Sequence, residues 1–211
     1  MSEMESFWGE LLSDVSPPSK LDISDVPVYE PQRDIFAEHK RKQWTKTGEQ
    51  RCDFSQHLTI AKRCSYMVVA PWKRTVFGRT LREIKADDTM VQRFAETMAQ
   101  LITDVLGNDL DRGGWALITT PKRRHRERNF ATRVCLLMAE VLRIPFYEDV
   151  AIACNTDRVH PVFRLNLVPE ENNLIVFDDI VTTGITIETT KQLLIPYHKN
   201  MMFFVGINNH L

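Results

Sequence analysis

Residues 173–190, with the sequence NLIVFDDIVTTGITIETT, constrain the fold of this chain more than any other segment. The run from Leu174 to Phe177 is short, apolar and partly β-branched, which is typical of a strand buried on both faces of a parallel sheet. Two carboxylates, Asp178 and Asp179, follow this run, and a helical pattern begins near residue 184. We expect the loop between strand and helix to lie beyond the carboxyl end of the strand, where open α/β sheets bind ligands.

The loop itself has the composition of a phosphate site. A turn that leads into a helix offers clustered backbone N–H groups, hydroxyl donors and the positive end of the helix dipole. The glycine allows a positive φ or a close backbone approach that a larger residue would resist. The predicted phosphate-binding residues are Thr182, Thr183, Gly184, Ile185 and Thr186.

The acidic pair indicates that the same ligand carries a second kind of group besides the phosphate. Asp178 and Asp179 would repel a phosphate group that touched them. They are better suited to accept hydrogen bonds from a vicinal diol, or to face a divalent cation. A diol and a phosphate at this separation describe a ribose 5-phosphate. The alternative is an ordinary turn between strand and helix with an acidic N-cap.

Residues 174–186 resemble the phosphoribosyl-pyrophosphate (PRPP) motif of type I phosphoribosyltransferases. That motif consists of an apolar strand followed by Asp-Asp, two further residues and Thr-Thr-Gly-x-Thr. This resemblance implies binding of PRPP or another ribose 5-phosphate-containing nucleotide. It also implies Mg²⁺ as the cofactor, carried on the pyrophosphate and facing Asp178 and Asp179 only indirectly. The expected strand and the expected helix on either side are the context that such a motif requires.

The rest of the chain alternates strands and helices, which predicts an α/β fold: a parallel twisted sheet with helices on both faces. The expected strands are 66–70 (stopped by Pro71), 115–119, 146–152 and 201–205. The expected helices are 80–85, a longer one capped by Asp87 or Asp88 and ended by Gly107, and 131–143. Residues 153–172 are expected to be irregular.

A basic segment follows the predicted strand 115–119 and should share the carboxyl edge with the acidic pair. Arginine carries a permanently charged fork that suits phosphate oxygens. The alternatives are a solvated entry to the next helix and non-specific contact with nucleic acid. The expected pyrophosphate loop is Thr120, Pro121, Lys122 and Arg123, and the expected catalytic arginines are Arg126 and Arg128.

The segment Arg126-Glu127-Arg128-Asn129-Phe130 is similar to the Arg-x-Arg-Gly-Phe-Asn pattern of the ComF-type branch of phosphoribosyltransferases. Asn129 replaces the glycine and Ala131 replaces the asparagine of that pattern. The resemblance spans roughly residues 65–208 and implies a mobile loop that carries Arg158 and Arg164. It supports PRPP binding better than it supports transferase turnover.

Length and composition predict one core with an appended part: residues 1–63 as an N-terminal extension or hood, and residues 64–211 as a phosphoribosyltransferase-like core. Prolines punctuate the extension, and a short helix is expected over 33–43. The formal net charge of −1 gives no overall reason to bind nucleic acid or a membrane. Four scattered cysteines and the absence of a secretory or apolar segment predict a cytoplasmic protein with reduced thiols. Cys52, His57 and Cys64 lack the paired spacing of a zinc site.

The resemblance implies a transferase that passes phosphoribose to a nitrogen nucleophile and releases pyrophosphate. The alternatives are an inactive domain that senses PRPP or a nucleotide, and an effector in DNA uptake or anti-phage defence that contacts nucleic acid. A protein partner would bind through the N-terminal extension, and a homo-oligomer is compatible with the sequence. The acceptor base is not encoded in any motif.

Overall fold

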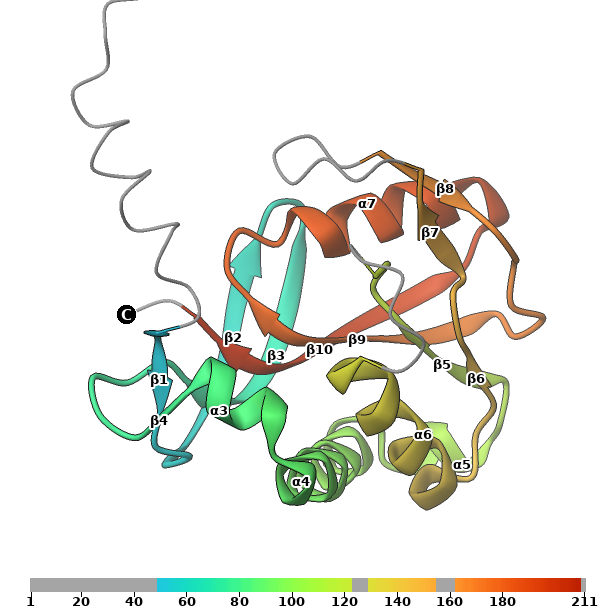
Figure 1. The fold of residues 1–211 in the computed structure, drawn as a ribbon. Helices are drawn as coiled ribbons and strands as arrows, with labels where there is room; N and C mark the ends of the chain where they lie inside the picture. The colour runs from blue at the N-terminus through green and yellow to red at the C-terminus, as the bar shows by residue number, and fades with distance from the viewer. Residues whose placement is uncertain (1–48, 123–128, 155–161, 210–211) are drawn as a thin grey trace, which may run out of the picture. The chain divides into compact units, whose positions relative to one another are not determined.

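The computed structural model describes residues 49–122, 129–154 and 162–209. Within these ranges six strands form one twisted sheet in the order β2-β3-β10-β9-β5-β6 (Figure 1). Neighbouring strands are parallel except β2 and β3, which are antiparallel. The strands of this sheet are β2 (Gln56–Arg63), β3 (Tyr66–Lys73), β5 (Trp115–Thr119), β6 (Phe146–Tyr147), β9 (Asn173–Val181) and β10 (Asn200–Asn208). The predicted α/β class is confirmed.

Helices cover both faces of the sheet (Figure 1). The side chains of β9 alternate between the two core layers. Ile175 and Phe177 of β9 pack with α4 and α6, whereas Leu174 and Val176 pack on the side of α7. This alternation explains why the strand is apolar throughout, because neither face meets water. The helices are α3 (Leu81–Ala86), α4 (Asp88–Leu106), α5 (Asn108–Asp111), α6 (Phe130–Leu142), α7 (Ile185–Leu194) and the 3-10 turn η3 (Ile195–Tyr197).

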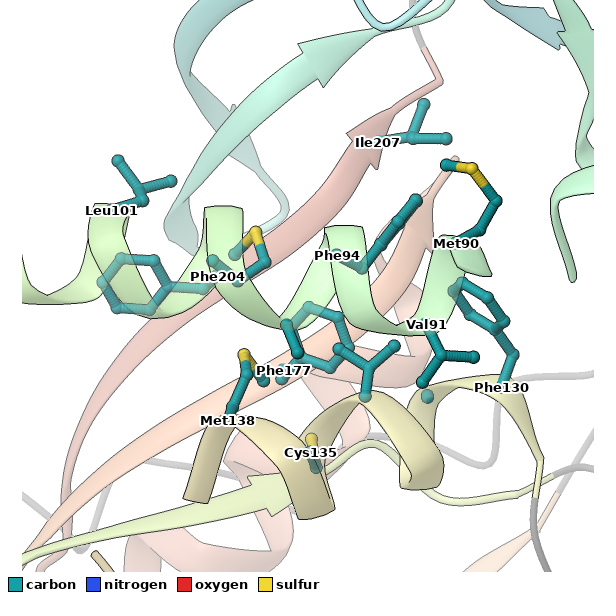
Figure 2. Close-up of a cluster of buried hydrophobic side chains, with 14 of the residues drawn as sticks. Met90, Val91, Phe94, Leu101, Phe130, Cys135, Met138, Phe177, Phe204 and Ile207 are labelled. Carbon is teal, nitrogen blue, oxygen red and sulfur yellow. The ribbon is translucent and has the colours of Figure 1, made fainter. Parts of the chain in front are cut away.

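Several aromatic rings pack against one another in the larger core layer, part of which Figure 2 shows. Phe94 of α4 has its ring centroid 4.6 Å from that of Trp72 in β3 and 5.0 Å from that of Phe130 in α6. Fully burying one such ring stabilises the fold by roughly 1.5 to 3 kcal/mol. Phe94 therefore joins two helices to the sheet beneath the carboxyl edge.

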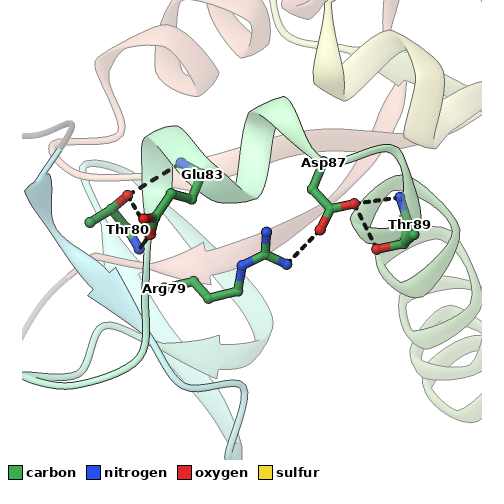
Figure 3. Close-up of polar contacts among 5 residues, drawn as sticks. All are labelled: Arg79, Thr80, Glu83, Asp87 and Thr89. Carbon is green, nitrogen blue, oxygen red and sulfur yellow. Dashed lines mark hydrogen bonds and ion pairs between the residues drawn. The ribbon is translucent and has the colours of Figure 1, made fainter.

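Two adjoining caps fix the entry into the helical layer (Figure 3). Thr80 accepts from the backbone N–H of Glu83 at 3.2 Å, and the Glu83 carboxylate accepts from the backbone N–H of Thr80 at 2.7 Å. Asp87 caps α4 by accepting from the N–H of Thr89 at 2.9 Å, and pairs with Arg79 at 2.7 Å. The predicted capping by Asp87 and the end of the helix at Gly107 are confirmed.

The strand expected to stop at Pro71 continues to Lys73 as β3. Proline lacks an N–H donor and is tolerated within sheets mainly at edges and bulges. β2 contains a register irregularity between Gln56 and Thr59, opposite the stretch of β3 that holds Pro71. Pro71 therefore lies where the backbone pairing between β2 and β3 is already interrupted.

The segment 146–152, expected as one strand, is two short strands with different partners. β6 pairs with β5 in the main sheet, whereas β7 (Ala151–Ala153) pairs with β8 (Phe163–Leu165) in a separate antiparallel pair. β8 also corrects the expectation that 153–172 is irregular. A third pair joins β1 (Arg51–Cys52) to β4 (Arg79–Thr80).

The core of the fold begins before residue 64. β2 belongs to the main sheet, so that sheet includes residues from Gln56 onward. The boundary expected at 63/64 falls in the turn between β2 and β3. The expected helix over 33–43 lies outside the described residues. None of the described helices combines the length and the apolarity needed to cross a bilayer.

Candidate functional site: an acidic pair beside a glycine turn

The acidic pair lies within β9, not after it. The strand was expected to end near Phe177, but it runs to Val181 and includes both Asp178 and Asp179. Backbone pairing with β10 continues beside the pair, with Val205 opposite Asp178. Both carboxylates are consequently held on a rigid element near the carboxyl end of a central strand.

Asp178 is partly buried, and the Thr120 hydroxyl is hydrogen-bonded to its carboxylate. Burial, together with repulsion from the neighbouring Asp179, raises the pKa of Asp178 to about 7, against the opposing effects of Lys85 and Thr120. A strongly perturbed carboxyl at a sheet edge is a common feature of functional sites. A cation or a diol at this position would relieve the repulsion.

Lys85 supplies the positive charge next to the pair. Its Nζ lies 2.7 Å from Oδ2 of Asp179, whose side chain is only 13% exposed. Burial lowers the pKa of Lys85, but the attraction of Asp179 and Asp178 outweighs it, so the pKa is raised overall. Our sequence reasoning missed this residue as part of the site. The signal was its place at the end of a short helix in the segment similar to the ComF-type branch.

The turn after β9 has the backbone that its glycine predicts. Gly184 adopts φ +83° at the N-cap of α7, which confirms the expected positive φ. A Cβ there would lie 2.3 Å from the hydroxyl oxygen of Tyr66. The Tyr66 hydroxyl donates to the carbonyl of Gly184 at 2.5 Å. Position 184 therefore excludes larger side chains both by conformation and by contact.

The threonines of the turn take part in local contacts. The side-chain amide of Asn209 donates to Oγ1 of Thr182 at 2.9 Å, and its backbone N–H donates to the carbonyl of Val181 at 2.9 Å. The N–H of Ile185 donates to Oγ1 of Thr183 at 3.5 Å, a long contact. The end of β10 therefore braces this turn from one side.

The turn between β2 and β3 braces it from the other side. The Ser65 hydroxyl contacts both carboxylate oxygens of Glu188 in α7, at 2.7 and 2.9 Å, and accepts from Nζ of Lys191 at 2.6 Å. The Cys64 thiol lies 3.6 Å from the carbonyl of Thr183. No local pattern predicts that residues 63–66 lie beside residues 182–186, because the two segments are more than a hundred positions apart.

The loop after β5 approaches the acidic pair as the parallel sheet requires. The N–H of Thr120 donates to the carbonyl of Phe177 at 3.1 Å, and Pro121 follows. Nζ of Lys122 forms ion pairs with Glu148 and, at 3.2 Å, with Asp149. The charge of this lysine is therefore already compensated within the protein. Arg123, Arg126 and Arg128 lie outside the ranges that the structure describes.

Arg164 is exposed and lies in β8, where it pairs with Ile152 of β7. This strand pairing corrects the expectation that the segment is irregular, whereas the place of Arg164 in a mobile loop stays a prediction. Arg158, the other residue expected in that loop, is not among the described residues.

The arrangement can accept hydrogen bonds, hold an anion and face a cation at one edge. Asp178 and Asp179 offer hard oxygen ligands, which are the kind that Mg²⁺ prefers. Across the described ranges, no group of three or more His, Cys, Asp or Glu side chains could hold a metal ion alone. Two carboxylates are an incomplete ligand set for Mg²⁺, so an ion at this edge would need further oxygen ligands from water or a bound molecule.

Comparison with known proteins gives structural likeness only. No protein-family model matches the chain, and no curated protein matches it by sequence. The chain is similar to the solved structure of adenine phosphoribosyltransferase from Saccharomyces cerevisiae, complexed with an imino-altritol bisphosphate and adenine. The identity is 12%, the TM-score is 0.46, and 81% of this chain and 89% of that chain are covered.

A second solved structure is orotate phosphoribosyltransferase from Aeropyrum pernix, with 17% identity, a TM-score of 0.43 and coverage of 79% and 80%. A third is a hypoxanthine-guanine phosphoribosyltransferase from Bacillus anthracis, with 14% identity, a TM-score of 0.39 and coverage of 58% and 79%. At these values the likeness identifies neither the family nor an activity of this chain. The argument for function depends on the residues at the sheet edge.

Proposed function

We propose that this edge of the sheet binds the ribose 5-phosphate part of PRPP, with Mg²⁺ on its pyrophosphate, and that the protein is a phosphoribosyltransferase. The observation that carries the proposal is the juxtaposition within one strand–turn–helix unit. Asp178 and Asp179 lie on the strand, and Gly184 with its positive φ opens the helix directly after them. A sugar diol and a phosphate need these two environments side by side.

The phosphate would bind at the start of α7. Backbone N–H groups from Thr182 to Thr186 and the positive end of the helix favour an anion there. The Tyr66 hydroxyl donates a hydrogen bond to the carbonyl of Gly184, and this bond helps to keep the turn in one conformation. A preorganised site loses less conformational entropy when the ligand binds.

The acidic pair would bind the ribose hydroxyls and stabilise positive charge that develops on the ring as pyrophosphate leaves. Displacement by a nitrogen nucleophile at C1 then needs positioning and electrostatics, without a covalent intermediate. Lys85, paired with Asp179, offsets part of the negative charge of the acidic pair and orients one carboxylate. Mg²⁺, when bound with the substrate, supplies Lewis-acid stabilisation of the leaving group. Arg126 and Arg128 remain the proposed contacts of that group.

Isothermal calorimetry with PRPP and Mg²⁺, and separately with ribose 5-phosphate, tests the binding site. The double variant Asp178→Asn, Asp179→Asn should bind ribose 5-phosphate at least about tenfold more weakly, because the charge-assisted bonds to the sugar are lost. The matched control is Asp104→Asn with Asp111→Asn, two exposed residues with the same change of charge. Equal affinity of the two double variants would remove the site assignment.

Turnover is tested by pyrophosphate release from PRPP with a panel of nucleobases. A second candidate, a domain that binds PRPP or a nucleotide without turnover, is favoured by one observation. Lys122 of the proposed pyrophosphate loop is engaged by Glu148 and Asp149 rather than presented to a leaving group. Tight binding of PRPP with no pyrophosphate release for any base would support the sensing domain.

A further inference from the structure

Arg63, at the end of β2, has only neutral partners. Its Nη1 donates to the carbonyl of Lys62 at 3.0 Å, and its Nη2 donates to Oδ1 of Asn208. Its Nε is buried and has no hydrogen-bond partner. Among the residues described, no carboxylate forms an ion pair with it. Arg63 therefore carries an uncompensated, partly buried positive charge.

This charge lies against the turn proposed to bind phosphate. A Cβ placed on Gly184 would be 3.0 Å from Cβ of Arg63, so the arginine begins beside the glycine. Its guanidinium reaches Asn208 at the end of β10. The next residue, Asn209, contacts Thr182 in the same turn. Arg63 thus runs along the flank of residues 182–184.

Asn209 is a second observation at the same place. It is only 5% exposed, and its Oδ1 has no partner. The oxygen and nitrogen of a side-chain amide are assigned from their surroundings, and the hydroxyl of Thr182 can donate as well as accept. With the amide turned over, Asn209 would present its N–H₂ group as a free donor. Two buried polar groups without partners therefore flank the turn.

A buried charge without a counter-ion is costly, and a buried donor without an acceptor adds to that cost. A water molecule could accept from Nε of Arg63 but would leave the charge uncompensated. A phosphate at the start of α7 would supply both the acceptor oxygens and the negative charge. Arginine is well suited to this role because its N–H groups match phosphate oxygens in geometry.

We propose that Arg63 is a phosphate-binding residue, which the turn between β2 and β3 contributes to the site after β9. The ligand class is the phosphate monoester of a ribose 5-phosphate, so this inference rests on the proposed function. Arg63 is the last residue of the expected N-terminal hood (residues 1–63), and it would then contact the sugar phosphate directly. Residues 65 and 66, tied to α7 and to Gly184, hold the arginine in place.

Calorimetry with ribose 5-phosphate and with unphosphorylated ribose tests this assignment. Arg63→Met should weaken binding of ribose 5-phosphate by about tenfold or more and leave binding of ribose unchanged. Lys62→Met is the matched control, because the neighbouring side chain is exposed and the change of charge is equal. Arg63→Lys should restore part of the affinity. Equal affinity of Arg63→Met and Lys62→Met would overturn the proposal.

Asn208→Asp provides a variant that keeps the arginine. The new carboxylate would lie at Nη2 of Arg63 and compensate its charge, so ribose 5-phosphate should again bind about tenfold more weakly. Wild-type affinity in this variant would also overturn the proposal, even if Arg63→Met fails to fold. If the wild-type protein binds ribose 5-phosphate no better than ribose, the proposed function fails and not merely the role of Arg63.

Discussion

Replacing Asp178 with asparagine should make the protein more stable at neutral and alkaline pH while weakening its ligand binding. The folded protein holds this carboxyl partly buried beside Asp179, and its pKa rises from 3.8 to about 7. The difference is about three pH units, and each unit corresponds to about 1.4 kcal/mol. Ionising Asp178 in the folded state therefore costs at most about 4 kcal/mol. Because the two carboxyls titrate together, a gain of about 1 to 3 kcal/mol is the expected result.

The pH dependence follows from the sign of the shift. At and below about pH 4 the folded carboxyl keeps its proton and the unfolded one is at least half protonated, so the wild-type protein and the Asp178→Asn variant should differ little. As pH rises from about 4 to about 7, the unfolded chain releases the proton that the folded chain keeps, and wild-type stability falls. The advantage of the variant should grow over this window and stay constant above it.

Urea denaturation of both proteins at pH 4, 6 and 8 measures this advantage. Asp179→Asn is the matched control, since it removes the same charge but also leaves Lys85 without its partner. The control should gain less stability than Asp178→Asn, or lose stability. An increase in the free energy of unfolding of Asp178→Asn that does not change with pH would refute this explanation. A decrease at pH 8 would also refute the claim that burial and repulsion from Asp179 disfavour the ionised Asp178.

Two further predictions concern the turn and the helical layer. Gly184→Ala should destabilise the fold by roughly 1 to 3 kcal/mol and weaken ribose 5-phosphate binding, because position 184 combines a positive φ with a contact to Tyr66. Gly113→Ala, at φ +79° with open space around it, isolates the conformational part, and equal losses in urea denaturation would contradict the role of the contact. Asp87→Ala removes the cap of α4, and the pKa of Asp87 is lowered to about 2. The stability that Asp87 contributes is present above about pH 4 and is lost as pH falls toward 2. The midpoint temperatures of thermal unfolding of Asp87→Ala and of the wild type should therefore converge in acid. A difference that stays constant with pH would contradict this.

Much of the architecture could be predicted from local patterns. Helix α4 follows from apolar residues at helical spacing between a capping aspartate and Gly107, and the structure has these limits. The conformation of Gly184 follows from the need for a residue without Cβ where a strand turns into a helix. These features depend on neighbours within a few positions, which the sequence presents directly.

Strand limits were less predictable, because pairing partners set them. β9 continues through two charged residues since β10 pairs with it as far as Val181. β3 continues through Pro71, opposite an irregularity in β2. The segment 146–152 divides because its two halves pair with different strands. In each case the deciding hydrogen bonds join segments that are remote in the chain.

The same distinction applies to the candidate site. The sequence by itself determined which residues lie on one strand–turn–helix unit, namely the acidic pair and the threonine-glycine turn, because their spacing is local. Only the tertiary structure decided their charged neighbours. In the fold, Lys85 forms an ion pair with Asp179, and Lys122 forms ion pairs with two carboxylates. Arg63 lies beside Gly184 in the turn after β9. These contacts depend on how the strands are ordered in the sheet, and no local pattern encodes that order.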